Sequence, residues 1–280
     1  MVKFCDKEDS LRDLFNIEKP VIGMIHLHPL PGAPGYKGDG MERIIELAVE
    51  EAKILERGGV DGLQVENMWD LPYHKPENIG VETVASMAVA ACKVRDAVSI
   101  PIGINCHING VIQSLAIAVA VEAKWIRAFE WTNAYIANPG YVEGAAPKAL
   151  RYRSFLKSDH IKIMADVHVK HGSHFLISDR AITEQAHDVE FFGADALIIT
   201  GSSTGTSPGI EELKEIKKKV SIPVIIGSGL KVENVAQFFK YTDGAIVGSY
   251  FKRDGVWWNP VDEERVRKLM REVKEIRKGL

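Results

Sequence analysis

The sequence predicts an α/β protein in which 280 residues form a single-domain (β/α)8 barrel. Short runs rich in Val and Ile alternate with segments of helical periodicity along the chain, and no linker or low-complexity stretch interrupts them. Eight such units in about 250 residues are typical of a barrel, although the count alone leaves an open doubly wound sheet as the alternative. We expect residues 20–280 to form the barrel and residues 1–19 to cap its end.

The expected strands follow one another at regular intervals. They are Val21–Leu27, Gly62–Asn67, Ile100–Cys106, Trp125–Trp131, Ile161–Val169, Ala196–Thr200, Pro223–Gly227 and Gly244–Gly248. The segments between them are helical in pattern, as in Met41–Arg57, whose apolar residues share one face. Asp39 and Glu42 are expected to form a capping box at the start of this helix. The short segment before Pro20 has apolar residues at helical spacing and is expected to plug the barrel.

The connections differ on the two sides of the expected sheet. Helix-to-strand links are tight, as at Gly193-Ala194, whereas strand-to-helix links such as His28–Gly40, Thr132–Lys148 and Gly201–Gly209 are long and polar. In a barrel the long links all emerge at the carboxyl ends of the strands, where sites in this fold are built. Functional residues are therefore expected where each strand ends.

Composition excludes several classes of protein. With 46% hydrophobic and 26% charged residues the chain is neither disordered nor fibrous, and its formal charge of -3 leaves no basic field for nucleic acid or an anionic membrane. The longest apolar run, Leu115–Val121, is far short of the ~20 residues that cross a bilayer, so we expect no integral membrane segment.

The N-terminus and the cysteines favour a cytoplasmic protein. Acidic residues, among them Asp6 and Glu8, stand where an export signal would be basic and then apolar. Cys5, Cys92 and Cys106 are odd in number and widely spaced, which fits free buried thiols better than disulfides or a zinc site.

Two glycine turns predict a phosphate site. The seventh and eighth expected strands end in Gly227-Ser228-Gly229 and Gly248-Ser249, each before a segment that can start a helix. Glycine lets backbone N–H groups turn toward an anion, a helix N-terminus adds partial positive charge, and barrels commonly bind phosphate at this pair of loops. Two ordinary tight turns are the alternative. Gly201–Thr206 is either an adjoining lid or simply a flexible loop.

The fifth expected strand places polar residues inside the barrel. Asp166, His168 and Lys170 alternate with apolar residues, so they should line the interior and approach the mouth together. A carboxylate, an imidazole and an ammonium can abstract a proton, polarise a carbonyl or hold a metal. The alternative is an internal ion pair, in which Asp166 neutralises Arg127 or Lys170.

The same parity argument selects residues on the first four strands. His26, Glu66 and Asn105 face inward at strand ends, with His107 following Asn105, and Glu130 joins them only if the fourth strand bends. His26, Glu66, Asp166 and His168 could bind a divalent metal such as Mg, Mn or Zn. No ligand motif with fixed spacing supports a metal, so direct acid–base use of these residues is the preferred interpretation.

Several strand ends carry short motifs in a fixed order. They are Gly23-Met24-Ile25-His26-Leu27 with Pro29-Leu30-Pro31-Gly32, Asp61-Gly62 through Glu66-Asn67, Ala165-Asp166-Val167-His168-Val169-Lys170-His171, Thr200-Gly201 with Thr204-Gly205, Gly227-Ser228-Gly229 with Glu233-Asn234, Asp243-Gly244, and Val247-Gly248-Ser249. As an ordered set over Val21 to Lys252, these motifs resemble the BtpA/SgcQ family. The resemblance implies a TIM barrel and, for cyanobacterial members, a link to accumulation of photosystem I.

Two functions follow as hypotheses. The residues favour an enzyme acting on a small phosphorylated metabolite, a sugar phosphate or nucleoside-derived phosphate, by lyase, isomerase or aldolase-type chemistry. Asp166 or His168 is then the general base, His26 or Asn105 orients the substrate, and Lys170 stabilises an enolate or forms a Schiff base. The alternative, from the resemblance, is a non-catalytic assembly or stability factor for a membrane complex such as photosystem I. A homo-oligomer is expected from the fold alone.

Overall fold

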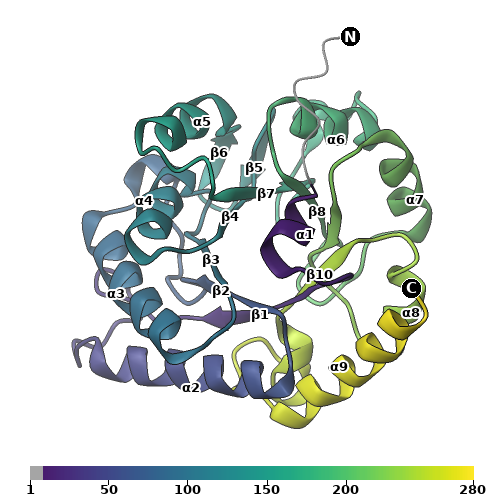
Figure 1. Ribbon diagram of the computed structural model, residues 1–280. Helices are drawn as coiled ribbons and strands as arrows, with labels where there is room; N and C mark the ends of the chain where they lie inside the picture. The colour runs from purple at the N-terminus through teal and green to yellow at the C-terminus, as the bar shows by residue number, and fades with distance from the viewer. Residues whose placement is uncertain (1–8) are drawn as a thin grey trace.

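A closed barrel of eight parallel strands forms the centre of the molecule (Figure 1). The computed structural model describes residues 9–280. Around the barrel the strands follow the order β1-β10-β9-β8-β7-β4-β3-β2. They are β1 (Val21–His26), β2 (Gly62–Glu66), β3 (Ile102–Asn105), β4 (Trp125–Ala128), β7 (Lys162–Val167), β8 (Ala196–Ile199), β9 (Val224–Ile226) and β10 (Gly244–Val247). The predicted fold class is confirmed, and each strand lies within its expected range.

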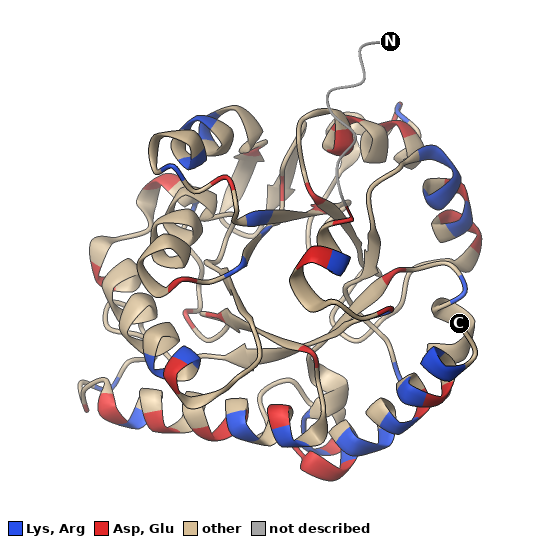
Figure 2. Cartoon of the chain, in the orientation of Figure 1, with Lys and Arg blue, Asp and Glu red and all other residues tan. Residues whose placement is uncertain are grey.

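Helices cover the outside of the barrel (Figure 1). They are α2 (Glu42–Gly58), α3 (Val81–Ala97), α4 (Val111–Val121), α5 (Ala146–Phe155), α6 (Ile182–Phe191), α7 (Ile210–Lys219), α8 (Val235–Phe238) and α9 (Glu263–Lys278). Charged residues are most frequent along α2, α7 and α9 (Figure 2). The inner face of α7 buries Leu213 and Ile216, as expected for a helix that is solvated on one side.

The expected capping box at the start of α2 is wrong. The N-cap is Met41, and no side chain caps the helix. A capping box requires the N-cap side chain to accept from the helix backbone, and Asp39 lies two residues too early. Gly40, with φ of +84°, turns the chain between Asp39 and the N-cap.

The barrel interior is filled by apolar side chains that are separate from the core under the helices. Ile22, Met24, Met164, Ile198, Ile225 and Ile246 form this cluster together with Trp125. Gly103 on β3 is needed here because any Cβ would lie 2.1 Å from the Trp125 indole on the neighbouring strand. The interior is therefore a packed core below the carboxyl ends of the strands.

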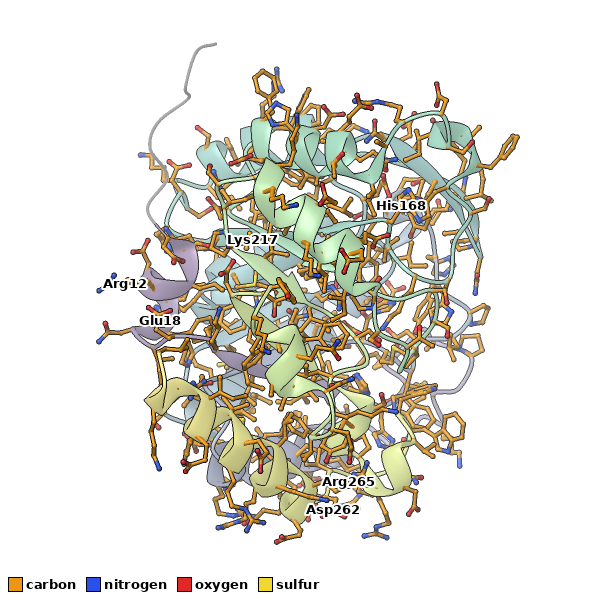
Figure 3. All side chains as sticks on the ribbon, turned by 90° about the vertical axis from the view of Figure 1, so that its right-hand side faces the viewer. Arg12, Glu18, His168, Lys217, Asp262 and Arg265 are labelled. Carbon is orange, nitrogen blue, oxygen red and sulfur yellow. The ribbon has the colours of Figure 1, made fainter. Side chains whose placement is uncertain are left out.

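The helix α1 (Ser10–Phe15) lies across one end of the barrel (Figure 1). Leu11 joins the interior cluster, Leu14 and Phe15 pack against it, and the Phe15 ring lies 5.4 Å from the Trp125 ring. In a side view, Arg12 and Glu18 lie at this end and His168 lies toward the other (Figure 3). The carboxyl ends of the strands thus form the opposite, open mouth.

One pair of strands was not anticipated. Within the expected loop Thr132–Lys148, β5 (Ala134–Ala137) and β6 (Gly140–Glu143) form an antiparallel hairpin around Asn138 and Pro139. Ile136 also bridges to Ser173 in the loop after β7. The turn residues Asn138-Pro139-Gly140 between short apolar runs were the sequence signal for this hairpin.

Cysteines and apolar helices agree in part with expectation. Cys106 is buried and Cys92 is half-buried, and both are free thiols. Cys5, Asp6 and Glu8 lie outside the described residues. Among the helices of residues 9–280, none combines the length and apolar character that crossing a membrane requires.

Candidate active site

A cavity of about 970 Å³ opens at the carboxyl ends of the strands. Its walls come from β1, β2, β4, β5 and β10 and from the loops that follow β2, β3, β7, β8, β9 and β10. Among the expected site residues, those that line it are His26, Glu66, Lys170, Gly227, Ser228, Gly229, Gly248 and Ser249. A cavity of this volume accommodates a small metabolite larger than phosphate.

The two glycine turns meet at this cavity through the loop of residues 201–207. The Gly205 N–H donates to Ser228 Oγ at 3.1 Å, and a Cβ on Gly205 would lie 3.7 Å from Ser249 Oγ. Gly229 has φ of +76°, and its Cβ would lie 2.4 Å from the Ser207 backbone nitrogen. Glycine at 229 therefore allows the loop to pack on the turn, whether or not an anion binds.

Helical segments follow both turns, as expected, but they are short. Ser249 begins only a single 3-10 turn, η3 (Ser249–Phe251), and α8 has four residues and starts at Val235. Such short elements carry little aligned dipole. Positive charge comes instead from Lys231, Arg265 and Lys268, which line the same cavity. Three acidic residues, Glu233, Asp254 and Glu264, line the cavity as well, so the side chains around the turns carry charges of both signs.

Arg127 and Asp166 form a buried ion pair beneath the cavity. Arg127 Nε and Nη2 donate to the two Asp166 oxygens at 2.7 and 2.8 Å. Burial raises the pKa of Asp166, and the Arg127 charge opposes the rise. Because a guanidinium stays protonated, the pair is ionic. Asp166 does not line the cavity, and both its oxygens are engaged, so the alternative of an internal ion pair describes it and a free general base does not.

His168 does not follow the expected alternation. The strand β7 ends at Val167, and His168 has φ of +54°, which turns its side chain away from the inward row. Its ring stacks on His174 at 4.3 Å, and burial lowers the pKa of His168 to about 4. His168 is absent from the cavity wall, whereas Val169 and Lys170 line it.

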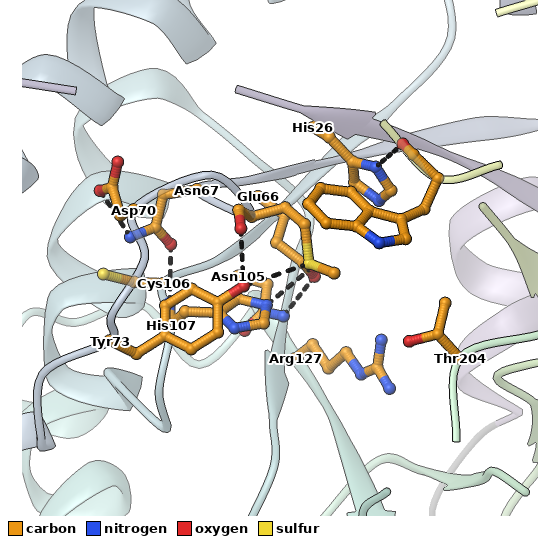
Figure 4. A network of polar contacts seen from close by, with 12 residues as sticks. His26, Glu66, Asn67, Asp70, Tyr73, Asn105, Cys106, His107, Arg127 and Thr204 are labelled. Carbon is orange, nitrogen blue, oxygen red and sulfur yellow. Dashed lines mark hydrogen bonds and ion pairs between the residues drawn. The ribbon is translucent and has the colours of Figure 1, made fainter. Parts of the chain in front are cut away.

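Glu66 is the centre of a polar cluster at the ends of β2 and β3 (Figure 4). Its Oε1 lies 2.8 Å from His107 Nε2, and its Oε2 accepts from Asn105 Nδ2 at 2.5 Å. Burial would raise the pKa of Glu66, but the contact with His107, together with the charge of Arg127, outweighs burial and holds this pKa below the usual range. Glu66 is therefore a carboxylate whose two oxygens both have partners.

His107 was not selected from the sequence as a site residue, yet it faces the cavity. The Tyr73 ring lies 4.5 Å from the His107 ring and the Phe129 ring 4.8 Å from it. The His107 backbone N–H donates to Asn67 Oδ1 at 2.7 Å, which fixes the start of this loop. The parity that His107 shares with Asn105 places it at the mouth of the barrel but does not indicate its contact with Glu66, which comes from the neighbouring strand.

His26 is held as a neutral imidazole at the end of β1. Its Nδ1 lies 3.2 Å from the Trp257 carbonyl oxygen, which can only accept, so Nδ1 carries the proton. Burial, reinforced by the Lys252 charge, lowers the pKa of His26 to about 3. Figure 4 shows this contact between His26 and the Trp257 carbonyl group. The other nitrogen, Nε2, would lie 3.7 Å from a Cβ on Gly248, so it is beside one of the glycine turns. An unprotonated nitrogen thus lies beside the expected phosphate site.

Lys170 and Glu130 differ in their access to the cavity. Lys170 lines it, and burial together with the Arg127 charge lowers the pKa of this amine to about 8. Glu130 is buried and does not line it. Burial, with the Asp166 charge, raises the pKa of Glu130 to about 9, so this carboxyl is protonated at neutral pH.

The four side chains considered as metal ligands do not converge. Across residues 9–280, no group of three or more His, Cys, Asp or Glu side chains is arranged to hold a metal ion. Asp166 is paired with Arg127, and His168 is turned toward His174. The set His26, Glu66, Asp166 and His168 is therefore not a metal site.

Solved structures share this fold at low sequence identity. Tryptophan synthase of Mycobacterium tuberculosis superposes with a TM-score of 0.61 at 15% identity over 96% of this chain and 98% of that one. (S)-3-O-geranylgeranylglyceryl phosphate synthase of Thermoplasma acidophilum, in complex with sn-glycerol-1-phosphate, gives 0.59 at 18% identity over 95% and 97%. N-(5'-phosphoribosyl)anthranilate isomerase of Pyrococcus furiosus gives 0.56 at 16% identity over 92% and 99%. These similarities support the barrel fold.

Relatives are similar over nearly the whole chain. An uncharacterized protein of Pyrococcus abyssi is 43% identical, covering 92% of this chain and 97% of the relative, and an uncharacterized mitochondrial protein of Caenorhabditis elegans is 39% identical, covering 95% and 97%. The photosystem I biogenesis protein BtpA of Synechocystis is 37% identical, covering 92% and 88%. The sequence model of the BtpA family matches residues 17–275. The chain belongs to the BtpA family.

Proposed function

We propose that the protein is an enzyme that acts on a small phosphorylated metabolite at the mouth of the barrel. One observation carries the proposal: the two Gly-Ser turns line the same cavity as an unprotonated histidine, a lysine of lowered pKa and the Glu66–His107 pair. Binding groups for phosphate beside acid–base groups are what a metabolic barrel enzyme requires.

The residues divide into binding and chemical roles. Backbone N–H groups of Gly227 to Gly229 and of Gly248 and Ser249 hold the phosphate, with Lys231 and Arg265 contributing charge. His26 Nε2 is the general base, because it is unprotonated and lies beside the turn. Arg127, which lines the cavity above Asp166, stabilises negative charge that develops on a substrate oxygen.

The wall opposite the glycine turns is apolar. Phe129, Tyr135, Ile108 and Val169 pack together there with Tyr73, and all of them line the cavity. Such a wall favours a substrate whose phosphate is joined to a planar or apolar group.

The comparisons support the general class and leave the reaction open. One structural neighbour was solved in complex with sn-glycerol-1-phosphate, and another is an isomerase of N-(5'-phosphoribosyl)anthranilate. At 18% and 16% identity they share a fold with this chain. Lyase or isomerase chemistry is therefore proposed from the residues of the cavity.

The Synechocystis relative supports a second candidate, a factor that assists assembly of a membrane complex. A relative that is about as similar to this chain as the Synechocystis protein occurs in Caenorhabditis elegans, an animal, whose cells have no photosystems. An activity shared across the family is then one that does not need photosystem I. An assembly factor would tolerate substitutions inside the cavity and lose function through changes on its surface.

Titration calorimetry with matched pairs of ligands tests the enzyme proposal. Ribose 5-phosphate and sn-glycerol 1-phosphate are compared with ribose and glycerol on the wild type and on Gly248→Ala, whose Cβ has only ordinary contacts of 3.4 Å or more. Gly209→Ala, outside the cavity, is the control. We expect binding of a phosphorylated compound only, about ten-fold weaker in Gly248→Ala. Equal affinity for phosphorylated and unphosphorylated members of each pair would overturn the proposal.

A further inference from the structure

The amine of Lys170 is placed in the cavity without a partner. Lys170 lies in the loop after β7 and lines the same cavity as the glycine turns. Within residues 9–280, its Nζ makes no hydrogen bond or ion pair, although its side chain is only partly exposed. Lysines elsewhere are neutralised when buried, as Lys252 is by Glu51 Oε1 at 2.5 Å. Lys170 is thus a half-buried cation in the cavity wall that has no ion pair of its own in the described part of the chain.

The neighbouring carboxylates are committed to other groups. The charges that act on Lys170 are those of Arg127, Glu66 and Asp166. Both oxygens of Asp166 accept from Arg127, and the oxygens of Glu66 face Asn105 and His107. Arg127 itself repels a second cation. A poorly solvated ammonium without its own counter-ion is costly, so the neutral amine is favoured.

We propose that Lys170 is a catalytic nucleophile that forms an imine with the substrate, and that the substrate is accordingly an aldehyde or ketone that also carries a phosphate. The inference rests on the proposed function and names the substrate class for the same site. The glycine turns hold the phosphate, and the carbonyl carbon lies against Nζ. A substrate without a carbonyl group would leave this amine unused.

The chemical step balances without a further reactant. The Nζ lone pair forms a bond to the carbonyl carbon while the carbonyl electron pair moves to oxygen, which takes the proton that nitrogen releases. The C–O bond then breaks, and the oxygen leaves as water after receiving the proton that the Lys170 ammonium gave up when it became the neutral amine. The net change is one ammonium and one carbonyl compound giving one protonated imine and one water. The imine draws electrons from an adjacent C–H bond, whose proton passes to His26 Nε2.

The lowered basicity agrees with this role. With a pKa of about 8, roughly a tenth of the Lys170 amine is unprotonated at pH 7, hundreds of times the fraction for an ordinary lysine. Lys231 is the natural internal control, since it lines the same cavity but is exposed. Any reagent that reaches the cavity meets both amines, so their relative reactivity isolates the effect of the environment.

Reductive trapping tests the inference, with pyridoxal 5'-phosphate as the phosphorylated aldehyde and pyridoxal as its unphosphorylated counterpart. Full-length protein is incubated with either probe, reduced with borohydride, digested, and the labelled lysines are identified by mass spectrometry. We expect the phosphorylated probe to label Lys170 at least ten-fold faster than Lys231, and inorganic phosphate to slow the reaction. The rate should rise with pH with a midpoint near 8. In Lys170→Arg, which keeps the positive charge, this label should disappear while phosphate binding remains.

The outcomes separate this inference from the proposed function. Labelling of Lys170 no faster than Lys231, in a protein that still binds ribose 5-phosphate by calorimetry, overturns the imine and leaves the phosphate site standing. Equal labelling of Lys170 by both probes supports the nucleophile and contradicts the phosphate site. If Lys170→Arg does not fold, as judged by circular dichroism, the rate ratio of the two lysines in the wild type still decides the matter.

Discussion

Single charged residues at the floor of the cavity are fixed by their partners more than by their position in the chain. Asp166 and Arg127 are 3% and 4% exposed and bind each other through two hydrogen bonds. The sequence placed Asp166 on the inward face of its strand and left the face of Arg127 open. It also left open whether Asp166 would pair with Arg127 or with Lys170. Period-two alternation specifies which face of a strand a side chain is on, but not which side chain of another strand it contacts.

Asp166→Asn should therefore reduce stability before it affects any chemistry. It removes the charge that compensates a buried guanidinium, so we expect the free energy of unfolding to fall by about 3–5 kcal/mol, measured by urea denaturation. The double variant Arg127→Met with Asp166→Leu should recover most of this loss, since no charge then stays uncompensated. An unchanged midpoint in Asp166→Asn would contradict the view that the pair is ionic.

His26 should give the stability a defined dependence on pH. Its pKa is about 3 in the folded protein, below the ordinary 6.5. Between these two values the unfolded chain binds a proton at His26 and the folded chain does not. The free energy of unfolding should thus fall as pH drops from about 6.5 toward 3, by up to about 1.4 kcal/mol per pH unit from this group. In His26→Gln, which does not titrate, the slope over this range should be shallower. Equal slopes in the two proteins would show that His26 protonates freely when folded.

At the scale of elements, the strands were predictable and their ends were not. All eight barrel strands fall inside the predicted ranges because each must bury an outer apolar face under helices. Alternation holds only while the backbone is extended, and β7 ends at Val167, where pairing with Ile199 of β8 stops. His168 then adopts φ of +54°. This backbone conformation belongs to the loop, so the periodic pattern of the strand does not predict it.

The loop of residues 201–207 depends on glycine at position 229. Gly229→Ala would bring a Cβ to 2.4 Å from the Ser207 nitrogen at φ of +76°, whereas Gly38→Ala has similar φ, +80°, and open space. Both variants carry the backbone strain of about 1 kcal/mol or more, and only the first also displaces the loop. We expect Gly229→Ala to be the less stable by thermal unfolding and to be cleaved faster by protease within residues 201–207. Identical cleavage in both variants would show that the loop does not rest on this turn.

For the molecule as a whole, the two ends of the barrel have different tasks. The mouth holds the polar groups, and the opposite end is closed by α1, whose Leu11 is 3% exposed. The sequence predicted this division from loop lengths, since long polar links gather on one side only. The hydrogen-bond partner of each carboxylate at the mouth could not be predicted, because these partners are side chains from different strands, β2 with β3 and β4 with β7, that meet only in the folded protein.

Stability and ligand binding should accordingly be separable. Leu11→Ala removes a buried side chain from the interior cluster and should lower the free energy of unfolding by about 2–5 kcal/mol. Because α1 lies at the end away from the cavity, the affinity for a phosphorylated ligand should change less than two-fold by calorimetry. Arg12→Ala, an exposed change on the same helix, should alter neither quantity. A loss of affinity in Leu11→Ala comparable to that in Gly248→Ala would mean that the packed interior transmits strain from one end to the other and that the mouth is not an independent site.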